Sequence, residues 1–66
     1  DNRILTLAKR LLVRHSLRTL DSLQLASALM VASSLPSPLT FISADIDLLK
    51  AATAEGLLTD DPNAHP

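Results

Sequence analysis

The segment from Leu20 to Ser33 constrains the fold most, because as a helix it would be apolar around nearly its whole circumference. Thr19 precedes this segment and is expected to be its N-cap, since a threonine hydroxyl accepts hydrogen bonds from free helix amides. A helix that is apolar all round is usually buried on several sides. The chain has only 66 residues, which leaves little material to cover such a helix. A partner chain or a further segment is therefore expected to cover part of it.

Helical and strand patterns alternate along the chain. Residues 15–18 form a short connection after a first helix, and Pro36 and Pro38 end the second. Gly56 is well placed to end the third helix in a left-handed conformation. The alternation predicts an α/β fold with a parallel sheet, but two strands are too few to form an independent one. The expected elements are helices over 3–14, 20–33 and 47–55, strands over 39–43 and 57–59, and a polar tail over 59–66.

Composition excludes several classes of protein. Apolar residues make up 47% of the chain, which is too many for a disordered segment. No apolar run approaches the roughly 20 residues of a membrane span, and the N-terminus has no signal-peptide pattern. The absence of cysteine excludes disulfides and thiolate metal sites. Phe41 is the only aromatic residue, so no platform exists for stacking bases. We expect a soluble, cytoplasmic protein.

Charge is distributed unevenly although the net charge is only −1. Five of the six basic residues lie in the first 18 positions, and six of the seven acids follow them. Such asymmetry indicates either a surface for an anionic partner or an ordinary solvated helix face, and the pattern leaves both open. His15, in the connection, has no ligand partner nearby and is expected to be a linker residue. The five basic residues are Arg3, Lys9, Arg10, Arg14 and Arg18.

Two aspartates stand where chemistry is possible. Asp21 lies in the first turn of the apolar helix, and Asp45 directly follows the first strand, with Asp47 two positions later. Ligands of open α/β sheets bind beyond the carboxyl ends of the strands, and carboxylates there suit Mg²⁺ or Mn²⁺. Each also has a purely structural reading: Asp21 would be stabilised by the helix dipole, and Asp45 would cap the third helix.

Two motifs resemble those of PIN-domain ribonucleases of the VapC toxin type. The segment 17–26 (LRTLDSLQLA) is similar to the family's LRxxDALHLA signature, with Ser22 in place of alanine and Gln24 in place of histidine. The segment 39–45 (LTFISAD) is similar to the hydrophobic strand followed by T/S-x-D. The resemblance continues through the third helix to Asp61-Pro62-Asn63 and so covers essentially the whole chain.

The resemblance implies a fold, a metal and partners. The fold would be the C-terminal half of an α/β/α sandwich, in which acids around Mg²⁺ or Mn²⁺ activate water for attack on RNA. Asp21 would correspond to the third acid of the family and Asp45 to the fourth, with Asp47 as an outer ligand. Arg10, Arg14 and Arg18 would bind RNA phosphates. The parent would be a toxin with a cognate antitoxin, and such proteins commonly form dimers.

The family's first two acids have no counterpart among these residues, so we expect the 66 residues alone not to form a competent nuclease. The other reading is a non-catalytic module that associates, as a homo-oligomer or with a partner, through the apolar helix over 20–33. A third reading is a small helical domain that resembles the family by chance, in which Asp21 and Asp45 would lie far apart.

Overall fold

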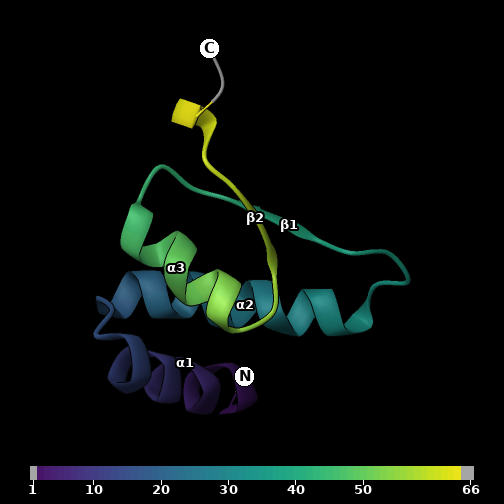
Figure 1. Cartoon of the computed structure of the whole chain (residues 1–66). Coiled ribbons are helices and arrows are strands. Elements are labelled where there is room, and N and C mark those ends of the chain that lie inside the picture. The colour runs from purple at the N-terminus through teal and green to yellow at the C-terminus, as the bar shows by residue number, and fades with distance from the viewer. Residues whose placement is uncertain (1, 65–66) are drawn as a thin grey trace.

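The computed structural model describes residues 2–64, which form a small, predominantly helical α/β fold (Figure 1). The expected order of elements is confirmed. The helix and strand boundaries differ from the expected ones by one residue, as is usual where helix and strand ends fray. The elements are α1 (Asn2–His15), α2 (Thr19–Ser34), β1 (Thr40–Ile42), α3 (Ile46–Ala54), β2 (Leu58–Asp60) and a 3₁₀ turn, η1 (Pro62–Ala64).

The three helices pack around a small core (Figure 1). The helices α1 and α2 run in opposite directions, and the two strands lie on the other side of α2 and α3 from α1. Four of the core residues are alanines, which let the helix backbones approach closely. The buried apolar residues are Ala8, Leu11, Leu25, Ala26, Leu48, Ala51 and Ala52.

The strands β1 and β2 pair in parallel, and helix α3 connects them, as the alternation of helix and strand in the sequence predicts. Phe41 is opposite Thr59, and Phe41 packs against the helical core. Side chains alternate between the two faces of a strand. Ile42 and Leu58 therefore lie together on the other face, where they are 65% and 56% exposed. Parallel sheets are almost always covered on both faces, and the described residues cover only one face of this sheet.

As expected, Gly56 ends α3 in a left-handed conformation. Gly56 has a φ of +96°, the left-handed region that glycine enters without a steric penalty. Its amide donates to the Thr53 carbonyl, and the Leu57 amide donates to the Ala52 carbonyl, both at 3.0 Å. This pair of bonds satisfies the last carbonyls of the helix. It also directs Leu57 back onto the core, so that the chain enters β2.

The start of α2 differs from the expectation, because Thr19 is not its N-cap. The helix begins one residue earlier than expected, with Arg18 in the cap position and no side-chain cap bond. Ser16, with a φ of +55°, turns the chain sharply out of α1. The extended Arg18 carbonyl then accepts from the Ser22 amide, so Thr19 is already helical and its hydroxyl lies in the wrong place to cap.

The C-terminal tail also begins later than expected. Asp60 belongs to β2 rather than to a polar tail, and Thr59, which the expected strand and tail shared, also lies in β2, because both residues pair with β1. Residues 61–64 form the 3₁₀ turn and its approach, with the Asp61 carboxylate accepting from the Asn63 amide at 2.8 Å. The last two residues of the expected tail, 65 and 66, lie outside the described residues.

Candidate functional site

Asp45 occupies the junction between β1 and α3, as its position in the sequence predicts. One of its carboxylate oxygens, Oδ1, accepts hydrogen bonds from the Asp47 amide at 3.0 Å and the Leu48 amide at 3.2 Å. The Asp45 amide in turn donates to the Ser43 hydroxyl at 3.0 Å. The structural reading of Asp45 as a helix cap is therefore confirmed. A carboxylate has about four lone-pair sites, so two amides do not exhaust its capacity to accept.

Asp60 lies at the same edge of the sheet. It ends β2 opposite Ile42, and its carbonyl accepts from the Ser43 amide at 3.2 Å. Because parallel strands end at a common edge, the carboxyl ends of β1 and β2 bring Asp60 next to the segment that leads to Asp45. The sequence pattern missed Asp60 because the expected strand stopped at Thr59. Extending the strand by one residue would have revealed it.

Asp21 lies in the first turn of α2 and is half-buried. The first turns of α2 and α3 lie at the same end of the molecule, on the left of Figure 1, and the two helices share a core. Asp47 is exposed in the first turn of α3. Among residues 2–64, no three acidic or histidine side chains come close enough together to hold a metal ion. The carboxylates of the described residues therefore do not form a complete cation site by themselves.

The expected phosphate-binding arginines are divided between two helices. Arg10 and Arg14 are exposed on α1, whereas Arg18 follows the turn and stands in the N-cap position of α2. Arg14 is also part of an ion pair that sequence reasoning missed. Its Nη1 donates to Glu55 Oε2 at 3.0 Å, although 58% of its side chain stays exposed.

His15 is not a simple linker residue, contrary to the expectation. Its Nε2 lies 2.7 Å from the same Oε2 of Glu55, and both side chains are only 15% exposed. A carboxylate can only accept, so this nitrogen carries the shared proton. The hydrogen bond from His15, with help from Arg14, holds the pKa of Glu55 below its ordinary value of 4.5, against the opposing effect of burial. The cluster ties the end of α1 to the end of α3.

Comparisons with known proteins give no relatives: no family model, no curated protein and no solved structure matches the chain. Within the described residues, no helix is long and apolar enough to cross a membrane.

Proposed function

We propose that this chain forms the C-terminal part of a metal-dependent endoribonuclease of the PIN-domain toxin type, acting in the cytoplasm. The observation that supports the proposal best is the position of Asp21 and Asp45. Asp21 lies in the first turn of α2 and Asp45 caps α3, at the same end of the molecule, and Asp45 follows the carboxyl end of a parallel strand (Figure 1). This is the region where ligands of α/β sheets bind. The two sequence motifs that resemble the family contain these same two residues.

The donor set suits a hydrated Mg²⁺ or Mn²⁺ ion but is incomplete. Such ions take carboxylate oxygens and retain several waters, so two protein ligands bind them only weakly. The acids that would complete the site would come from residues other than these. For that reason, we expect no RNA cleavage by the 66 residues alone. The antitoxin of the parent system would be a further partner.

Mn²⁺ binding tests this proposal. Mn²⁺ added to the ¹⁵N-labelled chain is expected to broaden the amide signals around Asp21 and Asp45 first, because a paramagnetic ion relaxes only nuclei close to it. Asp21→Asn should weaken the effect at both places by about 10-fold or more, the scale of a lost metal-site interaction. Asp61→Asn, which removes an equal charge from the C-terminal segment, is the control. Broadening that is unchanged in Asp21→Asn, or that appears around only one of the two aspartates, would exclude a metal site shared by Asp21 and Asp45.

A second candidate function is a non-catalytic association module, and a specific observation favours it. The solvent-accessible area of the described chain is 4591 Å², against about 4,100 Å² for a compact monomer of this mass. Leu20 and Val31 contribute to the excess. They are 11 residues apart, about three turns, and so lie on one face of α2. A second copy packed on this face would bury them.

Sedimentation equilibrium tests this second candidate. We expect a mass of at least twice 7.1 kDa for the chain, since exposed apolar patches of this kind rarely persist on soluble monomers. The double variant Leu20→Glu/Val31→Glu should sediment as a monomer. Leu5→Glu, which changes an exposed leucine on α1 instead, is the control and should still associate. A monomeric mass for the unmodified chain would refute association between copies of this chain.

A further inference from the structure

His15 is held in one orientation by Glu55, a residue 40 positions away in the sequence. The Nε2 of His15 lies 2.7 Å from Glu55 Oε2, which also accepts from Arg14 Nη1 at 3.0 Å. Because a carboxylate only accepts, the neutral ring of His15 keeps its proton on Nε2 and its lone pair on Nδ1. The contact with Glu55 therefore fixes the tautomer of His15 as well as tying α1 to α3.

The second ring nitrogen of His15, Nδ1, is open to solvent. Within the described part of the chain, this nitrogen has no hydrogen-bond partner, and no buried side-chain nitrogen or oxygen lacks one. Nδ1 is therefore part of the 15% of the His15 side chain that remains exposed. An imidazole with one nitrogen held by a carboxylate and the other nitrogen open has the arrangement of a nucleophile.

The charges around His15 favour an anionic reagent. Arg14 directly precedes His15, and 58% of its side chain is exposed. Its bond to Glu55 uses one of five N–H groups, so donors remain for a second partner. Guanidinium groups bind phosphate oxygens through paired hydrogen bonds. The reagent that fits both the nucleophile and the neighbouring cation is therefore a small phosphoryl donor.

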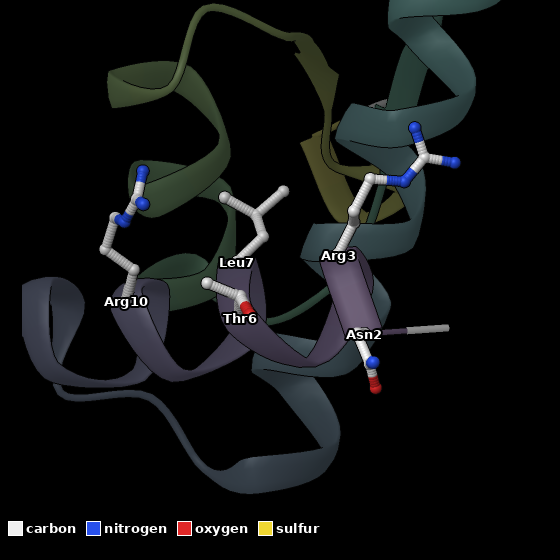
Figure 2. A pocket seen from close by; sticks show the side chains of 5 residues that line it. All are labelled: Asn2, Arg3, Thr6, Leu7 and Arg10. Carbon is white, nitrogen blue, oxygen red and sulfur yellow. The ribbon is translucent and has the colours of Figure 1, made fainter.

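The open hollow of about 320 Å³ along the first half of α1 offers no such nucleophile (Figure 2). Its side chains carry an amide, a hydroxyl, an aliphatic group and two guanidinium groups. A hydroxyl is a weak nucleophile unless a base activates it, and no base lines the hollow. The lining residues are Asn2, Arg3, Thr6, Leu7 and Arg10. Arg10 leaves α1 one turn before Arg14, on nearly the same side, and so adds to the positive charge near His15.

We infer that His15 Nδ1 is a modification site that accepts a phosphoryl group from a small anionic donor. The lone pair of Nδ1 attacks the phosphorus atom and forms an N–P bond. The bond from phosphorus to the leaving group breaks, and its electron pair departs with the leaving group. No proton has to leave Nδ1, because the proton of the ring lies on Nε2. The carboxylate of Glu55 balances the positive charge that the ring gains, and Arg14 donates to the phosphoryl oxygens.

Potassium phosphoramidate, a small donor whose leaving group departs as ammonia, tests the inference on the whole chain. Intact mass spectrometry at neutral pH should show the gain of one phosphoryl group, at His15 and not at His65, the only other histidine. His65→Gln should react as fast as the unmodified chain, whereas His15→Gln should react at least about 10-fold more slowly. Equal rates at the two histidines would overturn the inference, because they would reflect only ordinary imidazole reactivity.

The two ring nitrogens of His15 can be distinguished without any variant. Long-range ¹H–¹⁵N spectra of the unmodified chain, at a pH where the ring is neutral, should show the proton of His15 on Nε2. After reaction with phosphoramidate, the same spectra should show phosphorus on Nδ1. A proton on Nδ1 before the reaction, or a phosphoryl group on Nε2 after it, would refute the inference.

Glu55 and Arg14 act on the reaction as positioning residues, and two reagents separate their roles. Glu55→Gln should slow both phosphoramidate and the neutral reagent diethyl pyrocarbonate by about 10-fold, because the ring loses the carboxylate that orients it. Arg14→Gln should slow only the anionic phosphoramidate.

Lys9→Gln removes the same charge from another face of α1 and is the matched control, which should leave both rates unchanged. Circular dichroism checks that each variant is folded. An unchanged rate in Glu55→Gln, or equal effects of Arg14→Gln and Lys9→Gln on phosphoramidate, would contradict the arrangement described.

Discussion

Replacing Leu25 by alanine is expected to lower the free energy of unfolding by about 3 kcal/mol. Leu25 is 0% exposed and lies in the core that all three helices share. The substitution loses the transfer energy of the side chain and leaves a cavity that alanine neighbours such as Ala26 cannot fill. A domain of this size has a total stability of only about 3–10 kcal/mol. The variant is therefore expected to be largely unfolded or close to it.

Urea denaturation followed by circular dichroism measures this effect. Leu20→Ala is the matched control, because it makes the same chemical change in the same helix at a side chain that is 66% exposed. We expect the control to lose less than about 0.5 kcal/mol. Similar losses for the two variants would mean that Leu25 is not in the core described above.

Glu55→Gln is expected to lower the free energy of unfolding by about 1 kcal/mol at neutral pH. The substitution keeps the shape of the side chain but removes the negative charge of the carboxylate, whose Oε2 accepts hydrogen bonds from both His15 and Arg14. Arg14→Gln should cost less, because 58% of the Arg14 side chain is exposed and pairs of this kind contribute little in water. Comparing the two variants measures how much of the cluster's contribution to the free energy of unfolding comes from the more buried contact with His15.

The same variant should change how stability depends on pH. The pKa of Glu55 is lowered in the folded chain from its ordinary value of 4.5. Its contribution is therefore fully present above pH 4.5 and is lost as the pH falls through the lower folded value. The difference between unmodified chain and Glu55→Gln should shrink in that acid range. Thermal unfolding across the pH series measures the difference, and a loss that is constant with pH would contradict the linkage.

Local patterns in the sequence were enough to predict the order of the elements and, to within one residue, their ends. Helical spacing predicted three helices, the prolines after α2 predicted its end, and Gly56 predicted the reversal into β2. The capping reading of Asp45 was also available from the sequence, because an N-cap depends on amides only two and three residues away. In each case, the interactions that decide the structure connect residues that are close in sequence.

Other features were decided by packing alone. His15 and Glu55 are 40 residues apart, and neither has a local partner that signals the contact between them. Asp60 was assigned to a tail because its strand pattern is only three residues long, too short to extend with certainty from propensity. Its pairing with Ile42 follows from α3 returning the chain to the edge of β1. The failure of Thr19 to cap α2 likewise depends on the turn at Ser16.

The sequence by itself therefore determined which segments form helices and strands, where they end to within one residue, and which aspartates lie at helix N-termini. Only the tertiary structure decided which of these residues meet. It tied His15 to Glu55, added Asp60 to the edge of the sheet and left Ile42 and Leu58 uncovered. The physical reason is that helix and turn formation depends on bonds between neighbouring residues. Contacts between distant residues depend instead on how closely the alanine-rich helices pack.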